Sequence, residues 1–228
     1  MAKSLIACLA SFLLFSCTTT YVVNSVHTPL LRNQGEIQAG VNLKSSELIV
    51  PTVEPEIAIA ITNHIGIMAN GSFAFKNAND VDPGKLYHRR NFSEAGLGYF
   101  NDISKKFKYE VYAGYGYGSI DERYKDSDDE TIIYNSVSYN RWFFQPTIVY
   151  RSYLDVAFTP RFIAVEYQRN SGDNPNFTAI EPVVSIQTGK KLILQSQIGY
   201  SFRLNQQFDG DYNPLIFAVG VKYCFGRK

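Results

Sequence analysis

Period-two alternation of apolar and polar side chains runs through this chain from Gly35 almost to its end. The side chains of a β-strand point alternately to opposite faces, whereas an amphipathic helix repeats every 3.6 residues. The pattern is most regular from Phe107 to Tyr117, where Phe, Tyr, Val and Ala alternate with Lys, Glu, Tyr and Gly. No segment beyond Gly35 shows helical periodicity. The alternation therefore predicts an all-β protein.

The connections between the alternating segments are of two kinds. Short reversals are predicted near Asn63, Asp102, Ser152 and Gly189, and longer polar loops near Ser45, Asp82, Asp126, Gly172 and Asp209. The ten predicted strands cover 36–43, 56–61, 65–75, 91–100, 107–117, 141–150, 155–165, 180–187, 192–201 and 215–225. An even strand number with short periplasmic turns and long outer loops is typical of outer-membrane barrels. Residues 35–228 are therefore expected to form a single antiparallel up-and-down transmembrane β-barrel.

Alternation alone does not decide which face of a barrel meets lipid. A soluble lipocalin-like barrel would hold its apolar side chains inside, around a ligand. Here every predicted strand has an apolar face with aromatic residues near its ends, as in interfacial girdles. We therefore expect the opposite, polar face to line the lumen, with its charges paired and glycines making room for Tyr112 and the arginines. The predicted lumen network comprises Glu36, Glu56, Glu94, Glu110, Arg141, Gln145, Arg161 and Glu181.

Two prolines fall inside predicted strands of this closed barrel. A proline cannot donate to the ladder, so Pro146 and Pro160 predict β-bulges or non-bonded register at their positions. Pro55, Pro182 and Pro214 are placed nearer to strand starts, where a missing donor matters less.

The first residues have the pattern of a secretory signal. A basic start is followed by an apolar run from Leu5 to Phe15, which is too short to span a membrane as a helix. Residues 14–17, Leu-Phe-Ser-Cys, resemble the lipobox of bacterial lipoproteins. The resemblance implies cleavage before Cys17 and attachment of a diacylglycerol to its thiol. We expect a signal peptide over 1–16 and a lipidated tether over 17–34, with the lipid in the periplasmic leaflet. The alternative is an ordinary signal peptide with an incidental cysteine.

Composition excludes several other classes of protein. The net charge is +1, which does not point to a nucleic acid or another polyanion as partner. After cleavage only Cys17 and Cys224 remain, so no disulfide framework is expected. Cys224 is interpreted as a membrane-facing or packed thiol. No motif or spacing points to a metal or another cofactor. The acidic run Asp121–Glu130 lacks the spacing of an EF-hand and is interpreted as a solvated outer loop.

Several scaffold motifs resemble a family of small outer-membrane β-barrel lipoproteins of Gram-negative bacteria. They are residues 29–31 with 35–36, 62–71, 94–100, 110–116 and 181–182. The end of the chain, Tyr223-Cys224-Phe225, also resembles the C-terminal aromatic signature of outer-membrane barrels. The resemblance implies an outer-membrane location and a barrel fold, and it implies no particular chemistry.

Three functions are compatible with this pattern. The first is a structural or surface-interaction role in which the outer loops meet an unidentified protein partner. The second is a narrow pore or transport accessory for small solutes. If the barrel were soluble instead, the protein would be a lipid-tethered lipocalin-like carrier. The third is an enzyme similar to ten-stranded omptin-type proteases, for which only His88 with Asp80 and Asp82 is available. A single histidine beside two loop aspartates is weak support, and we expect that the protein is not an enzyme.

Overall fold

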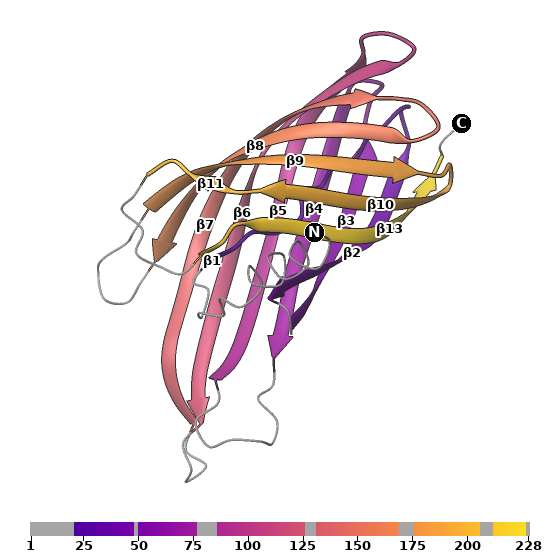
Figure 1. Cartoon of the computed structure of the whole chain (residues 1–228). Helices are drawn as coiled ribbons and strands as arrows, with labels where there is room; N and C mark the ends of the chain where they lie inside the picture. Colours follow the sequence, from indigo (N-terminus) through magenta and orange to yellow (C-terminus); the bar gives the residue numbers. More distant parts are fainter. Residues whose placement is uncertain are drawn as a thin grey trace, which may run out of the picture.

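The chain forms a closed barrel of ten antiparallel strands (Figure 1). This computed structural model describes residues 21–47, 50–76, 86–125, 131–168, 176–205 and 212–226. The barrel strands are β2 (Ile37–Glu47), β3 (Val50–Ala60), β4 (Ile65–Lys76), β5 (Leu86–Asp102), β6 (Phe107–Lys125), β7 (Thr131–Tyr150), β8 (Asp155–Gln168), β9 (Asn176–Thr188), β10 (Leu192–Tyr200) with its continuation β11 (Phe202–Arg203), and β13 (Leu215–Phe225). A separate parallel pair joins β1 (Tyr21–Val22) to β12 (Tyr212–Asn213). Among the described residues, no helix is long and apolar enough to cross a membrane.

Each barrel strand pairs with the next one along the chain, and β13 closes the ring. One edge of β13 pairs with β10 and the other with β2, where Tyr223 lies opposite Ala39. The predicted ten-stranded up-and-down barrel is thereby confirmed. The loop predicted near Ser45 is wrong, because β2 continues to Glu47 and β3 begins at Val50. Residues 77–85, 126–130, 169–175 and 206–211, where the other long loops were predicted, lie outside the described residues.

Strands β5, β6 and β7 are longer than predicted, at 17, 19 and 20 residues. The prediction ended where the outward apolar pattern ends: beyond Tyr117 and Trp142, the outward positions are occupied by polar residues such as Ser119 and Ser136. A transmembrane strand needs only about 9–11 residues. These three strands therefore continue beyond the apolar band, at the end of the barrel that carries the longer connections (Figure 1).

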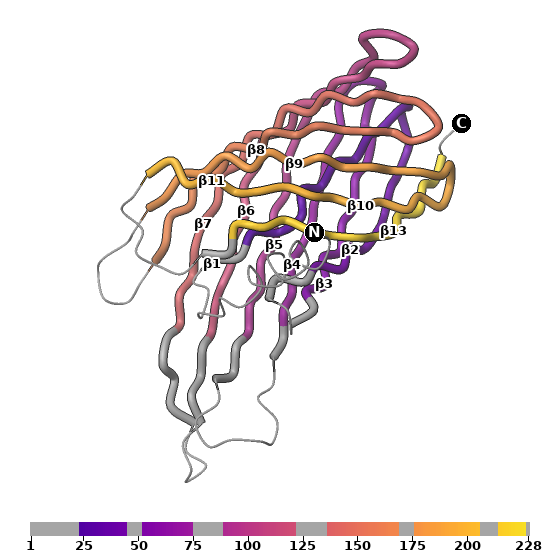
Figure 2. The backbone as a smooth tube through the Cα atoms, viewed as in Figure 1, coloured from indigo at the N-terminus to yellow at the C-terminus, as the bar shows by residue number. Residues whose placement is uncertain are grey.

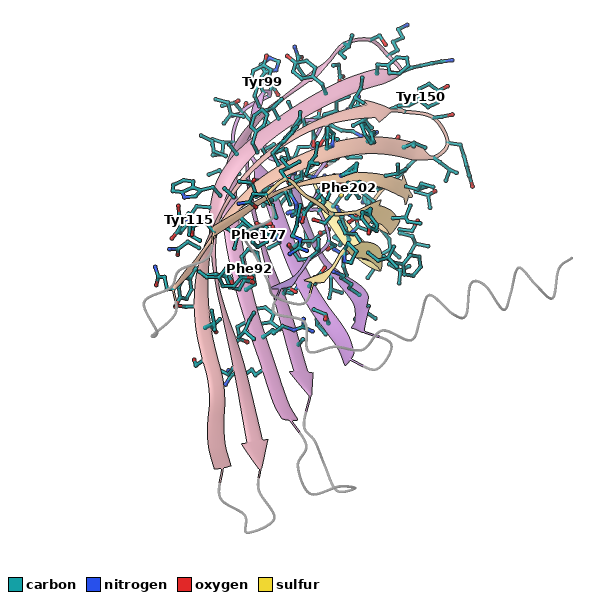
Figure 3. All side chains as sticks on the ribbon, turned by 60° about the vertical axis from the view of Figure 1, so that its left-hand side comes forward. Phe92, Tyr99, Tyr115, Tyr150, Phe177 and Phe202 are labelled. Atoms are coloured by element: carbon teal, nitrogen blue, oxygen red, sulfur yellow. The ribbon has the colours of Figure 1, made fainter. Side chains whose placement is uncertain are left out.

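The outer face of the barrel is apolar and the inner face is polar. Leu97, Ile148 and Phe217 are about half exposed on the outside, whereas charged side chains such as Arg161 and Glu181 are fully buried inside. Figure 3 shows Tyr99, Tyr115 and Tyr150 projecting from the outer surface. A lipocalin would have the opposite arrangement, so the soluble-carrier alternative is excluded for this fold.

Aromatic pairs lie at two levels of the outer surface. Phe107 and Tyr150 pack with ring centroids 5.3 Å apart beside the short turns, and Tyr115 and Trp142 pack at 4.8 Å farther up the strands. The Tyr115 hydroxyl donates to Asn140 Oδ1 at 2.6 Å, beside the point where the outward face becomes polar. Aromatic residues with an apolar body and a polar tip favour the two interfaces of a bilayer. The two levels of aromatic pairs therefore mark the edges of the lipid-facing band.

Prolines interrupt the ladder without shifting its register. Between β7 and β8, Phe144 pairs with Phe162 and Ile148 with Phe158, while the three positions between them, which set Pro146 opposite Pro160, are unpaired. Equal spacing on both strands excludes a bulge, so the non-bonded register predicted at these prolines is confirmed. Two opposed prolines leave one gap in the ladder rather than two, because both missing donors fall at the same place.

Pro55 and Pro182 were expected near strand starts but lie in the middle of β3 and β9, because both strands begin earlier than predicted. The β9 ladder with β10 stops at Val183 and resumes with β11 at Ile180 in the same register. The gap lies at Pro182, and it is the reason why one barrel strand is divided into β10 and β11.

Candidate functional site: the lumen and its threaded segment

The N-terminal segment Val23–Leu31 lies inside the barrel, and we call it the threaded segment. Its residues are buried, with Val23, Val26, Thr28 and Leu31 at 0% exposure. Figure 2 shows this indigo part of the backbone within the ring of strands. Residues 17–34 were expected from the sequence to form a lipidated tether at the periplasmic end of the barrel. The structure instead places the middle of that stretch in the lumen.

The threaded segment crosses the lumen from the long-loop end to the short-turn end. At the long-loop end, Tyr21–Val22 pairs in parallel with Tyr212–Asn213, just before β13 begins. At the other end the Arg32 guanidinium donates to Asp155 at 2.9 Å, and the Gln34 N–H donates to Asn63 Oδ1 at 3.1 Å. Asp155 and Asn63 adjoin short turns, so the chain leaves the lumen there and turns back into β2.

The backbone of the threaded segment is held by side chains of the barrel wall. Gln197 of β10 accepts from the Val26 N–H at 3.0 Å and donates to the Val26 carbonyl at 2.6 Å. Gln145 of β7 donates to the His27 carbonyl at 2.8 Å. The wall amides therefore satisfy backbone groups that, inside a barrel, have no neighbouring strand to pair with.

Thr28 and Leu30 extend these contacts toward the short-turn end. The Thr28 carbonyl accepts from Gln187 of β9 and from the Lys222 ammonium of β13, each at 3.0 Å. The Leu30 N–H donates to Glu110 of β6 at 3.1 Å, and Leu30 has a positive φ of 53°. A positive φ is rare for a residue other than glycine. The contact with Glu110 and burial of the Leu30 side chain offset the strain of that backbone turn.

Asn24 connects the threaded segment to the principal cluster of charges. Arg141 of β7 donates to Asn24 Oδ1 at 2.6 Å, and Arg161 of β8 donates to the Asn24 carbonyl at 3.2 Å. Both arginines also meet Glu94 of β5: Arg141 in a short ion pair, and Arg161 at 3.6 Å. Arg161 further pairs with Glu181 of β9 at 2.6 Å. One asparagine of the threaded segment is thus bonded to two guanidinium groups from the adjacent strands β7 and β8.

All eight residues of the predicted lumen network are buried on the inner face. Glu94, Arg141, Arg161 and Glu181 form the continuous cluster described above. The others lie apart from it: Glu56 meets Lys222 at 2.9 Å, Glu110 meets Lys108 and Leu30, Gln145 meets His27, and Glu36 accepts from the Arg32 N–H at 2.8 Å.

Several residues that complete these contacts were not predicted as part of the lumen network. Lys108 and Lys222 each provide the cation for a predicted glutamate. Their positions on the polar face of the alternation could have identified both lysines. Asn24, Thr28 and the backbone of Val26 could not be found in that way, because the threaded segment has no alternating pattern and its partners come from distant strands.

An aromatic layer lies above the charge cluster, toward the long-loop end. Phe92, Tyr139, Tyr167 and Phe177 stack in sequence across the lumen, with ring centroids 5.6–6.2 Å apart. The Arg141 guanidinium lies 4.0 Å from the centroid of the Phe92 ring, so this layer rests on the charge cluster. A cavity beside Asn24 and Phe92 measures about 20 Å³, which is room for about one water molecule. In the part of the lumen that the structure describes, side chains occupy this level.

The three histidines do not form a common site. His27 is buried in the threaded segment, and His64 stacks on Tyr99 at 5.7 Å beside a short turn. His88 belongs to β5, opposite Lys76 and Glu122 in the register, rather than to a loop. Asp80 and Asp82, its proposed companions, lie outside the described residues, as does Cys17. Among the described residues, no group of three His, Cys, Asp or Glu is placed to hold a metal ion.

Cys224, interpreted from sequence as a membrane-facing or packed thiol, is buried on the inner face of β13. It lies two residues after Lys222, on the same face of the strand, near the short-turn end.

No protein-family model matches the chain, and a search of curated proteins finds no relative. Among solved structures, the translocator domain of the autotransporter NalP from Neisseria meningitidis has a TM-score of 0.47 at 12% identity, covering 99% of this chain and 95% of that one. Ail, the attachment invasion locus protein of Yersinia pestis, has a TM-score of 0.41 at 9% identity, covering 84% and 99%. A major outer membrane protein from Thermus thermophilus has a TM-score of 0.35 at 9% identity, covering 83% and 99%.

The geometry of the barrel itself gives the location of the protein. An apolar exterior bounded by aromatic residues surrounds a polar interior, and the strand number is even. This arrangement is that of an outer-membrane barrel, which meets lipid on the outside and pairs its backbone within a closed sheet. The protein is an outer-membrane β-barrel.

Proposed function

We propose that this protein is a self-plugged outer-membrane lipoprotein with a structural or surface-interaction role, and that it has no catalytic activity. The observation that carries the proposal is the threaded segment, which occupies the lumen and is bonded by wall side chains. A pore would need a continuous water-filled path, and a carrier would need a ligand cavity. With its interior filled, the surface left for a partner is the long-loop end, where β5, β6 and β7 continue beyond the lipid-facing band.

The contacts of the threaded segment support a permanent plug rather than a gate. Its backbone is hydrogen-bonded by side chains of seven strands, namely β3, β6, β7, β8, β9, β10 and β13. The contact from β3 is made by Glu54, which accepts from the Ser25 N–H at 2.9 Å. A net contribution of about 1 kcal/mol for each such hydrogen bond makes withdrawal of the segment costly. The withdrawn state would also remove one hydrogen-bond partner from each of several buried charged groups of the wall, such as Glu110, Arg161 and Lys222.

Planar-bilayer recording of the purified protein tests the plug. The wild-type protein is expected to give no steady conductance under a voltage at which an open porin of similar strand number conducts. A variant lacking residues 23–31 serves as the open control, provided that its folded barrel is retained, as judged by the heat-dependent shift of its mobility in detergent gels. A steady wild-type conductance would overturn the proposal and favour the narrow pore.

Lipidation at Cys17 rests on the likeness of residues 14–17 to a lipobox. Cells grown with an alkyne fatty acid are expected to incorporate the label into the wild-type protein. A Cys17→Ala variant carrying an ordinary signal-peptidase site should lack the label, whereas a Cys224→Ala variant should retain it. Absence of label from the wild-type protein would leave a barrel without an anchor and contradict the lipoprotein assignment.

A further inference from the structure

We infer that the lipid on Cys17 is inserted in the outer leaflet, at the cell surface, because Tyr21, where the described chain begins, lies at the long-loop end of the barrel. The inference rests on the lipidation proposed above. It differs from the sequence-based expectation, which placed the lipid in the periplasmic leaflet on the assumption that the N-terminal stretch stays outside the barrel.

The course of the chain gives the direction of exit. β1 pairs in parallel with β12, and β12 leads directly into β13, which runs from the long-loop end down to the short turns. The threaded segment therefore descends beside β13, and Arg32 emerges at the short-turn end beside Asp155. Tyr21, where the described part of the chain begins, therefore lies at the long-loop end. In outer-membrane barrels the longer loops face the cell exterior.

The dimensions agree with a complete crossing. From Val22 to Arg32 the chain can extend over at most about 36 Å, which exceeds the roughly 25 Å height of the apolar band of a barrel. Three residues lie between Cys17 and Tyr21, and the four steps from one to the other can extend over at most about 14 Å. The hydrocarbon core is about 30 Å thick, so a lipid on Cys17 cannot reach the periplasmic leaflet while Tyr21 stays on β12.

The pairing of β1 with β12 also brings the chain to the rim of the barrel. β12 belongs to the connection between β11 and β13, and both of those strands are part of the wall. A chain that leaves the lumen beside this connection can pass directly over the rim into the adjacent lipid. Acyl chains each contribute about 0.8 kcal/mol per buried methylene, which favours insertion at the nearest leaflet.

The two ends of the threaded segment are then held on opposite sides of the membrane. On the periplasmic side, Gly35 donates to the Ala60 carbonyl at 2.9 Å and the chain becomes part of the wall. On the outer side, the acyl chains are too bulky to pass through a lumen filled by the aromatic layer. The lipid thus acts as a stop that prevents the plug from sliding back, in addition to anchoring the protein.

Cysteine labelling of intact cells tests the direction of exit. Thr20→Cys is made in a Cys224→Ala background and exposed to a membrane-impermeant maleimide. Ser136→Cys, on the outward face beyond the lipid-facing band, is the cell-surface control, and Ser152→Cys, in the short turn after β7, is the periplasmic control. Thr20→Cys is expected to label in intact cells as strongly as Ser136→Cys, whereas Ser152→Cys should label only after permeabilisation.

Fatty-acid labelling of the same strains separates the two proposals. If Thr20→Cys labels only after permeabilisation in a lipidated protein, the lipid is periplasmic and the inference is overturned while the lipoprotein assignment stands. If Thr20→Cys labels in intact cells but no fatty acid is incorporated, the threading is supported and the anchor is overturned. Thr19→Cys repeats the measurement one residue away, and heat-dependent gel mobility verifies that each labelled barrel is folded.

Discussion

The side-chain amide of Gln197 bonds both backbone groups of Val26, accepting from its N–H at 3.0 Å and donating to its carbonyl at 2.6 Å. A neighbouring β-strand would offer the same pair of groups to an extended residue. The two residues are separated by 171 positions in the chain, so this contact exists only once the barrel has formed around the threaded segment.

Replacement of Gln197 is expected to destabilise the folded barrel. Gln197→Leu keeps the side-chain volume but leaves the Val26 N–H and carbonyl buried without their partner, at a cost of about 1–3 kcal/mol for each group. Urea unfolding in detergent micelles or lipid vesicles should show a lower midpoint. Gln168→Leu, at an exposed position near the end of β8, is the matched control and should shift the midpoint little. Equal effects of both variants would show that the contact with Val26 contributes nothing.

The Arg161–Glu181 pair should behave as a coupled buried ion pair. Arg161→Met removes one partner of the 2.6 Å contact and leaves Glu181 charged in the lumen, with an expected loss of about 3–5 kcal/mol. Adding Glu181→Leu should recover a substantial part of that loss, because no unpaired charge then remains at that end of the cluster. A double-mutant cycle on the free energy of unfolding measures the coupling. Strictly additive losses would contradict the pairing.

Gly98 provides the space in which the Tyr112 ring lies. Gly98 pairs directly with Tyr112 across β5 and β6, and a Cβ at Gly98 would overlap the ring. Gly98→Ala is therefore expected to destabilise the barrel by about 1–3 kcal/mol, through overpacking. Tyr112→Leu in the same chain should relieve the overlap, so that the double variant is less affected by the alanine than the wild type is. If Gly98→Ala were equally destabilising with Leu at position 112, overlap with the Tyr112 ring would not be the cause of the destabilisation.

The lipid-facing side of β5 should not tolerate a charge. Leu97 is 59% exposed on the outer face, between the two levels of aromatic pairs. Leu97→Arg should reduce the free energy of unfolding in lipid vesicles by about 2–4 kcal/mol, whereas Ser136→Arg, beyond the lipid-facing band, should reduce it by about 0–1 kcal/mol. If both variants were as stable as the wild-type protein, the outer face around Leu97 would be exposed to water rather than to lipid.

The strands alone should hold the protein in the membrane. In the Cys17→Ala variant with a restored cleavage site, alkaline carbonate washing of envelopes is expected to leave the protein in the pellet. Its lipid-facing band does not depend on the acyl chains. Release of the variant into the wash would show that the lipid was the only attachment.

The strands and their faces could be read from the sequence because side-chain alternation is a local property. Lys108, Glu110 and Tyr112 lie on one face of β6, whatever the rest of the chain does. Because the opposite face is apolar and meets lipid in a membrane barrel, the face with these three residues points into the lumen. Strand ends were less predictable. In the outer parts of β5 to β7 both faces are polar, so the pattern that defines a lipid-facing strand ends before the hydrogen-bonded ladder does.

The position of the threaded segment inside the lumen is determined only by the tertiary structure. Val23–Leu31 has no alternation that predicts a strand and no cap or period that predicts a helix, so its sequence alone is equally compatible with an external tether. Its position depends on side chains such as Glu110 and Lys222, which are 80 and 194 residues away from the groups that they bond. The sequence alone determined that a barrel with a polar lumen would form. What fills that lumen, and on which side the N-terminus emerges, depends on contacts that exist only after the ring has closed.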